Sequence, residues 1–285
     1  MAITAQQVKA LREKTGAGMM DCKKALTEAG GDEEQAVAWL REKGLAKAKK
    51  RADRATTEGL ISQKIGDNAA VMIEVMCETD FVAKSDKFQD FVAKATSLAF
   101  ENNPETPDQL LAMSIDSGKT LNDDLNEMIA VLGESIQMGS IIRLELQGPG
   151  SFGSYVHSNG KIGVLVEFGT EKDTSSEEFQ EIAKGVAMQV AALSPLCVRS
   201  EEVPADMLEK EKEIYRKQSL EEGKPPEIAE KIVEGRMKKY FKEVCLLDQP
   251  FVKDDKKSVD QIVKSFDKDI TVRRFVRMEL GAQNK

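Results

Sequence analysis

The chain repeats one pattern: a strand, a turn, a second strand and a helix. In the first copy, residues 60–65 and 71–75 have the β-branched and aliphatic character of strands and flank the turn residues 66–68. Apolar residues between Phe88 and Ala99 then recur at helical spacing. This order predicts a β-hairpin that is covered by one helix.

The second copy begins at about Gly153. Residues 164–168 match the strand at 71–75, and residues 179–182, which open an Ala- and Val-rich helix, match residues 88–91. An internal duplication in one chain predicts two similar lobes that pack together. We therefore expect an α+β protein whose duplicated α/β core lobes contain antiparallel sheets.

Two segments lie outside this repeat. The sequence of the N-terminal segment, residues 1–53, predicts three short helices, the first of which begins with a capping box at Thr4 and Gln7. This segment resembles a ubiquitin-associated (UBA) module. The second segment, residues 204–244, is rich in Glu and Lys, and its sequence predicts an antiparallel coiled-coil hairpin that turns at residues 223–226. Its narrow apolar stripe suits a partner or a second copy of the chain, but also a self-contained hairpin. The expected domains are residues 1–53 (UBA-like module), 54–139 (first lobe), 140–203 (first part of the second lobe), 204–244 (inserted hairpin) and 245–285 (second part of the second lobe and C-terminal segment).

Composition excludes several classes of function. Lys and Arg number 41 against 49 Asp and Glu, a formal net charge of −8, which argues against a dominant nucleic-acid surface. One histidine, His157, and four separated cysteines can hardly assemble a zinc site, and no Walker-type phosphate loop occurs. No apolar run is long enough to cross a membrane, and no secretory signal precedes the first helix. We expect a cytoplasmic protein with reduced thiols and without a metal or other cofactor.

Residues 148–153 fit the GxGxxG pattern of dinucleotide-binding folds. Such a site needs a helix directly after the glycines, because the helix N-terminus faces the pyrophosphate. The residues that follow predict a strand, a turn at Asn159 and Gly160, and another strand. Asn-Gly favours a type I′ turn, in which both central residues have positive φ. We therefore interpret the glycines as a loop that enters a hairpin.

Two long motifs resemble signatures of the bacterial translation elongation factor Ts family. Residues 11–26 (LREKTGAGMMDCKKAL) are similar to its N-terminal signature, and residues 74–84 (EVMCETDFVAK) are similar to its second signature. Residues 223–239 and 249–252 provide a third match, so the resemblance covers essentially the whole chain in the same order. Met76 departs from the family, which usually has Asn at that position.

The resemblance implies a guanine-nucleotide exchange factor for elongation factor Tu, the GTPase of translation elongation. Such a factor binds the GDP form, displaces Mg²⁺, promotes GDP release and leaves when GTP enters, without covalent chemistry. The family match assigns Mg²⁺ dislocation to the segment Thr79, Asp80, Phe81 and Val82. It also suggests partner contacts at Arg12, Met19, Met20, Leu132, Gly133 and His157.

The residues themselves leave these roles open. Phe81 lies seven residues before Phe88, a spacing that is more typical of a shared core stripe than of partner binding. Thr79 would then only cap a helix. The remaining contact candidates are compatible with bundle core, helix surface or, for His157, an exposed turn.

Three other functions compete with nucleotide exchange. A protein-binding adaptor would use the UBA-like module and leave GDP release unchanged. An RNA-binding, ribosome-associated factor would use the basic stretch 43–54, although charge runs are usually solvated and the net charge opposes this function. A metabolic enzyme would need a nucleophile or base in a pocket, and the sequence offers only isolated carboxylates.

Overall fold

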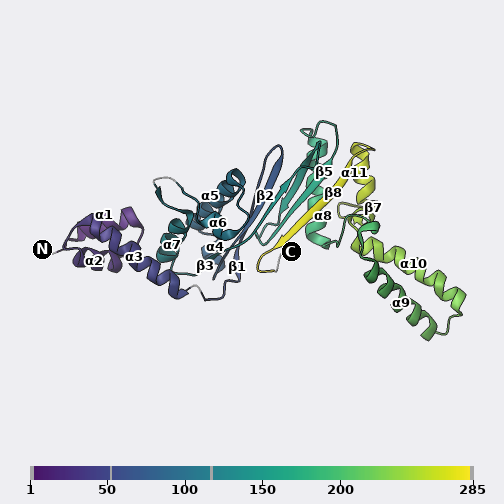
Figure 1. The fold of residues 1–285 in the computed structure, drawn as a ribbon, viewed down its shortest axis with the longest axis horizontal. Helices are drawn as coiled ribbons and strands as arrows, with labels where there is room; N and C mark the ends of the chain where they lie inside the picture. Colours follow the sequence, from purple (N-terminus) through teal and green to yellow (C-terminus); the bar gives the residue numbers. More distant parts are fainter. Residues whose placement is uncertain (1–2, 52, 116–117, 283–285) are drawn as a thin grey trace.

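The computed structural model describes residues 3–51, 53–115 and 118–282, without the side chains of Lys47 and Lys49 in the basic stretch. The molecule is elongated (Figure 1): a helical bundle lies at the N-terminal end, two lobes form the middle, and a helical hairpin projects from the other end. The chain is a mixture of helices and small antiparallel sheets, so the α+β class is confirmed.

The N-terminal bundle consists of α1 (Ala5–Thr15), α2 (Met19–Glu28) and α3 (Glu33–Arg51). The predicted capping box is confirmed, because the Thr4 hydroxyl accepts from the Gln7 amide while the Gln7 side chain accepts from the Thr4 amide. Leu11, Cys22 and Ala25 are fully buried between the helices. The likeness of this bundle to a UBA module stays a prediction.

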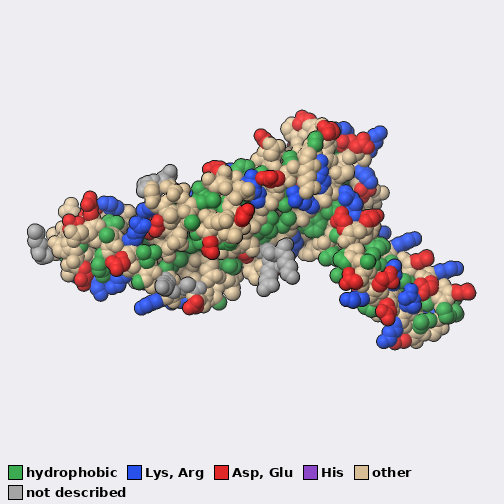
Figure 2. Space-filling view, in the orientation of Figure 1, with side chains coloured by type: hydrophobic (Ala, Val, Ile, Leu, Met, Phe, Trp, Pro, Cys, Tyr) green, Lys and Arg blue, Asp and Glu red, His purple; other side chains and the backbone are tan. Residues whose placement is uncertain are grey.

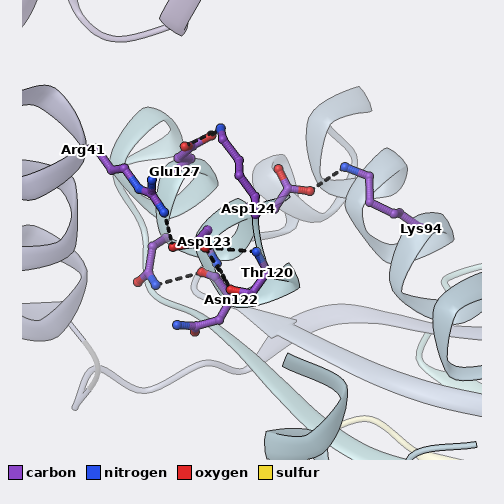
Figure 3. Close-up of polar contacts among 9 residues, drawn as sticks. Arg41, Lys94, Thr120, Asn122, Asp123, Asp124 and Glu127 are labelled. Atoms are coloured by element: carbon purple, nitrogen blue, oxygen red, sulfur yellow. Dashed lines mark hydrogen bonds and ion pairs between the residues drawn. The ribbon is translucent and has the colours of Figure 1, made fainter. Parts of the chain in front are cut away.

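Helix α3 continues through the basic stretch and packs on α7 (Leu121–Leu132) of the first lobe. Figure 3 shows Arg41 reaching Asp123 of α7, with its Nη2 2.6 Å from the Asp123 Oδ1. Arg51, the last residue of α3, donates to the carbonyl of Ile129 at 3.1 Å. At least part of the basic stretch therefore faces α7 rather than solvent, and these contacts tie the bundle to the lobe.

The first lobe contains one antiparallel sheet in the order β1 (Glu58–Ile65), β2 (Ala69–Cys77) and β3 (Ile136–Glu145). Between β2 and β3 the chain forms α4 (Asp80–Ala83), α5 (Asp86–Asn102), α6 (Pro107–Leu111) and α7. Helix α5 buries Phe88, Phe91 and Ala95 against the sheet. Thr120 begins α7 with a second capping box, formed with Asp123.

The second lobe repeats this arrangement with the order β4 (Gly150–Val156), β5 (Ile162–Gly169) and β8 (Thr271–Glu279), and with α8 (Glu177–Leu193) after the hairpin. The predicted duplication of strand, turn, strand and helix is confirmed. Strand β4 begins within the glycine-rich segment, so a strand rather than a helix follows Gly148 and Pro149, as predicted. The interpretation of the whole segment as a loop was wrong, because Gly150 and Gly153 are part of β4.

The turn between β4 and β5 differs from the expected type I′ turn. Gly160 has φ 71°, whereas Asn159 is not among the residues with positive φ. The Gly160 amide donates to the carbonyl of His157 at 2.7 Å, and the His157 amide donates to Ile162 at 2.9 Å. The type I′ prediction was wrong because this longer loop needs only one left-handed residue, which glycine supplies.

Two helices, α9 (Ala205–Glu221) and α10 (Pro226–Val244), form the projecting hairpin. Charged side chains of both signs cover it (Figure 2), in agreement with the Glu- and Lys-rich sequence. The chain returns through β6 (Pro250–Phe251), β7 (Asp254–Ser258) and α11 (Val259–Phe266) before β8 completes the second sheet. Short 3₁₀ turns, η2 (Ser200–Glu202) and η3 (Leu246–Asp248), lie at the base of the hairpin.

The expected domain boundary at 139/140 falls inside β3. This strand pairs with β2 from Ile136 to Glu145, so the residues that we assigned to the second lobe belong to the first sheet. A segment belongs to the sheet whose strands it pairs with, and the local sequence does not show which distant strand that is. We therefore propose a boundary after β3, near residue 147.

The two sheets share a hydrophobic core. Ile61 and Met72 of the first sheet pack with Leu165 and Met278 of the second, and all four are buried. Gln63 of β1 reinforces this contact, since its side-chain amide donates to the carbonyl of Val164 at 3.1 Å. The lobes therefore form one body that carries loops from both sheets at a common end.

Candidate functional site

Phe81 lies on the surface. Its exposed fraction is 82%, and no other large apolar side chain in the described part of the chain is more exposed. The core-packing interpretation was therefore wrong. Phe88 is fully buried, but a turn at Lys84 and Ser85 separates α4 from α5, so the seven-residue spacing does not place the two rings on one helical face.

Residues on both sides of Phe81 fix the backbone of the short helix α4. Thr79 caps the helix, as predicted, because its hydroxyl accepts from the Val82 amide at 3.4 Å. Val82 is buried in the first-lobe core and anchors the helix there. Asp80 binds Lys84 at 2.7 Å, and this hydrogen bond holds the pKa of Asp80 below its usual value. Neighbouring residues thus fix the backbone while the Phe81 ring faces outward.

Glu134 connects α4 to the end of α7. The Thr79 hydroxyl donates to the Glu134 Oε1 at 2.6 Å, and the Thr79 amide donates to its Oε2 at 3.0 Å. Sequence reasoning missed this residue. The available signal was its position directly after Gly133, whose φ of 81° ends α7 and turns the chain toward α4.

Glu78 makes the reciprocal connection. Its Oε1 accepts from the Ser135 amide at 2.6 Å and from Arg54 at 3.2 Å. The hydrogen bond from Ser135 is the main cause of the lowered pKa of Glu78. The preceding residue, Cys77, is buried, and burial together with Glu134 raises its pKa to about 12. Its thiol therefore stays protonated and belongs to the packing. The hydrogen bonds of Glu134 and Glu78 thus bring the segment 79–82 close to Leu132 and Gly133.

His157 lies in the β4–β5 loop, at the same end of the first sheet. The Ile61 amide donates to the carbonyl of Gly160 at 2.8 Å, and Lys161 binds Glu58 at 2.7 Å. Glu58 pairs across the sheet with Cys77, two residues before Thr79. The imidazole is exposed, and its Nδ1 lies 3.1 Å from the Tyr155 hydroxyl.

Arg12, Met19 and Met20 lie on the bundle surface. Met19 and Met20 begin α2 with exposed fractions of 59% and 75%, so their alternative placement in the bundle core was wrong. The loop before them approaches the first lobe, since a Cβ on Gly16 would lie 2.6 Å from the Nζ of Lys87, near the start of α5. Met19 follows Gly16 by three residues, so the loop that leads to the two methionines approaches the chain that follows α4.

The surface around α4 and the start of α2 presents exposed apolar side chains, those of Phe81, Met19 and Met20. Over residues 3–51, 53–115 and 118–282, no three His, Cys, Asp or Glu side chains are grouped so that they could hold a metal ion. Within the same ranges, no helix is long and apolar enough to cross a membrane. The arrangement presents the exposed Phe81 ring on a fixed short helix, and it leaves Met19 and Met20 on the bundle and His157 on the second lobe exposed as well.

The sequence of this chain is similar to those of known proteins over most of its length. A family model described as Elongation factor TS matches residues 78–282. Elongation factor Ts of Lawsonia intracellularis is 50% identical over 294 residues, covering 99% of this chain and all of the relative. The proteins of the same name from Trichlorobacter lovleyi and Clostridium perfringens are 48% and 47% identical, covering 99% and 98% of this chain and 93% of each relative. The chain therefore belongs to the elongation factor Ts family.

Proposed function

We propose that this chain is a guanine-nucleotide exchange factor for elongation factor Tu. It binds the GDP form of that GTPase, displaces Mg²⁺ and promotes GDP release so that GTP can bind. Membership of the elongation factor Ts family supports the role in translation elongation. The observation that carries the proposal is Phe81, an exposed aromatic ring on a fixed four-residue helix.

Burial of an exposed aromatic ring provides the driving force. Moving one Phe side chain out of water stabilises a complex by about 1.5–3 kcal/mol. If the receiving pocket of the GTPase opens only when the elements that hold Mg²⁺ have moved, this free energy opposes Mg²⁺ and nucleotide binding. The coupling is reciprocal, so GDP and Mg²⁺ weaken the binding of this chain by the same factor. No covalent step is needed.

A wedge of this kind must not yield when it meets its partner. The two hydrogen bonds from Thr79 to Glu134 and the burial of Val82 leave the backbone of α4 little freedom. Less free energy is therefore lost in ordering this segment on binding. We assign Mg²⁺ dislocation to residues 79–82, with Glu134 as the residue that positions them.

The other contact candidates extend the surface on both sides of Phe81. Met19, Met20 and Arg12 approach from the bundle, Leu132 and Gly133 lie beside Thr79, and His157 lies on the second lobe. Apolar side chains such as those of Ile214 and Ile228 are exposed on the projecting hairpin, which suits self-association. The function implies a cytoplasmic location and requires neither a membrane nor direct nucleic-acid binding.

The release of fluorescent GDP from bacterial elongation factor Tu tests the proposal. We expect the wild-type chain to accelerate release strongly and Phe81→Ala to lose about 2 kcal/mol of that effect, roughly thirtyfold in rate, as for an interface hot spot. Leu193→Ala removes another exposed apolar side chain, at the end of α8, and should behave as wild type.

Each other outcome has a distinct meaning. A folded wild-type chain that leaves GDP release unchanged would exclude the exchange function and favour the adaptor. Equal acceleration by wild type and Phe81→Ala would preserve the function but remove the wedge. Acceleration that falls equally in both variants would show that loss of apolar surface in general, rather than Phe81, matters.

A further inference from the structure

A cavity of about 270 Å³ lies between the N-terminal bundle and the first lobe. Its apolar wall includes Val37, Trp39 and Leu40 from α3 together with Ala130 and Val131 from α7. None of the contact candidates for the GTPase lines it. An apolar cavity of roughly 150 Å³ accommodates one benzene ring, so this one has room for two fused rings.

The acidic side chains around the cavity are already engaged. Asp123 binds Arg41, and Lys119 donates to both oxygens of Glu127, at 2.7 and 2.9 Å (Figure 3 shows Asp123 and Glu127 on α7). Asp21 also has an interaction partner. The Thr120 amide, and then Arg41, lower the pKa of Asp123 to about 2, so this carboxylate stays ionised and paired at neutral pH. The carboxylates around the cavity therefore already have partners and do not favour the binding of a cation.

Lys43 differs from the other basic residues of this lining. Its Nζ lies 4.5 Å from the centre of the Trp39 ring, and no ion pair of Lys43 occurs among the residues that the structure describes. An ammonium group without a described carboxylate partner, next to an aromatic ring in the lining of a cavity with an apolar wall, is complementary to a ligand with an apolar body and one negative charge.

We propose that this cavity binds a small aromatic carboxylate. The ring system of the ligand lies against Trp39 and the α7 wall, and its carboxylate accepts hydrogen bonds from the Lys43 ammonium. Because Trp39 and Lys43 belong to α3 whereas Ala130 and Val131 belong to α7, the bound ligand holds the bundle on the first lobe. This binding does not depend on nucleotide exchange and needs no partner protein.

The single tryptophan provides the readout. A ¹⁵N-labelled full-length chain has one indole N–H signal, that of Trp39, which we expect to shift saturably when 2-naphthoate is added. Isothermal titration calorimetry then gives the affinity. Lys43→Ala should weaken 2-naphthoate binding about tenfold, the scale of one charge-assisted hydrogen bond. Lys50→Ala, on the same helix but outside the cavity lining, should leave the affinity unchanged.

A neutral ligand with the same rings, 2-naphthylmethanol, separates the charge from the apolar contact. We expect it to bind more weakly than 2-naphthoate and to bind wild type and Lys43→Ala equally. The proposal is overturned if the indole signal does not shift saturably at millimolar 2-naphthoate. It is also overturned if Lys43→Ala and Lys50→Ala bind 2-naphthoate equally, or if the alcohol binds as tightly as the carboxylate. Thermal unfolding of each variant verifies its fold.

Discussion

Glu74 and Glu167 occupy matching positions in the two repeats, and each holds the chain that leaves the other sheet. The Gly281 amide, two residues after β8, donates to the Glu74 Oε1 at 2.6 Å. The Gln147 amide, two residues after β3, donates to the Glu167 Oε1, also at 2.6 Å. Both glutamates are buried, so this exchange of hydrogen bonds closes the contact between the lobes from both sides.

The two sites differ in how their charge is compensated. Glu167 also binds Arg274 at 2.7 Å and Arg273 at 3.2 Å. Glu74 instead accepts a second backbone hydrogen bond, from Ser140 at 3.1 Å. A register shift in the strand pairing accompanies each glutamate, between Ile73 and Val75 in β2 and directly after Glu167 in β5. These irregularities turn a charged side chain toward the chain that it must reach.

Replacing Glu167 with Gln should destabilise the fold. The substitution removes a buried negative charge and leaves the two arginines facing a neutral amide, a change that costs about 3–5 kcal/mol when a buried ion pair is broken. Urea unfolding measures the difference. Glu145→Gln, on the exposed end of β3, is the control and should change the free energy of unfolding by less than about 0.5 kcal/mol. A similar loss in both variants would contradict the role of Glu167.

Acid should weaken the same contact. Burial alone raises the pKa of Glu167, but the Gln147 amide and the two arginines outweigh burial and lower the pKa from 4.5. The folded pKa is thus below the unfolded one, so the stabilisation is present above pH 4.5 and is lost as the pH falls through the folded pKa. Unfolding free energies between neutral pH and pH 3 should fall less steeply for Glu167→Gln. Equal slopes would contradict this assignment.

Phe81→Ala should leave the stability of the free chain almost unchanged. The ring is exposed, so its removal leaves no cavity, and we expect a change within about 0.5 kcal/mol. Phe88→Ala is the matched comparison, because this ring is fully buried and its loss should cost about 3–5 kcal/mol. Denaturant unfolding of both variants separates the surface ring from the core ring. A large loss of stability in Phe81→Ala would show that the ring packs in solution.

Glu134→Gln should slow nucleotide exchange without unfolding the chain. The Gln oxygen can still accept from the Thr79 amide, but an NH2 group replaces the carboxylate oxygen that accepts from the Thr79 hydroxyl. A charge-assisted hydrogen bond that holds α4 is thereby exchanged for a weaker neutral one, at a cost of about 1 kcal/mol. If that cost falls on the exchange complex, GDP release should slow about fivefold. Glu171→Gln, an exposed substitution on the second lobe, should not slow release. Unchanged release with Glu134→Gln would exclude the positioning role.

Two glycine substitutions should have opposite signs. A Cβ at Gly153 of β4 would lie 2.7 Å from the backbone oxygen of Ala183 in α8, so Gly153→Ala should push α8 away and cost about 1–3 kcal/mol. At Gly235, in the middle of α10, a Cβ meets nothing within 4 Å, and Gly235→Ala should stabilise the hairpin by about 0.5–1 kcal/mol. Melting temperatures, and hydrogen exchange within α10, test both. Destabilisation by Gly235→Ala would contradict the open space seen there.

Local features of the chain were predictable from the sequence. The capping boxes at Thr4 and Thr120 depend on residues three positions apart. The repeated strand, turn, strand and helix follow from periodicity within single segments, and the absence of a helix directly after the glycines at 148–153 could be predicted because a strand pattern follows them. The second signature motif, residues 74–84, suggested the segment 79–82 as a site. These features need no knowledge of distant residues.

Contacts between distant segments required the tertiary structure. The exposure of Phe81 contradicted its spacing from Phe88, because a break between α4 and α5 changes the direction of the ring. Glu134 reaches Thr79 across 55 positions, and Glu74 reaches Gly281 across 207. The sequence alone determined the elements, their caps and the repeat, since short-range sterics and hydrophobic periodicity act within each segment. Which strands share a sheet and which side chain faces outward were decided only when the lobes packed, because pairing and burial depend on residues far apart in the chain.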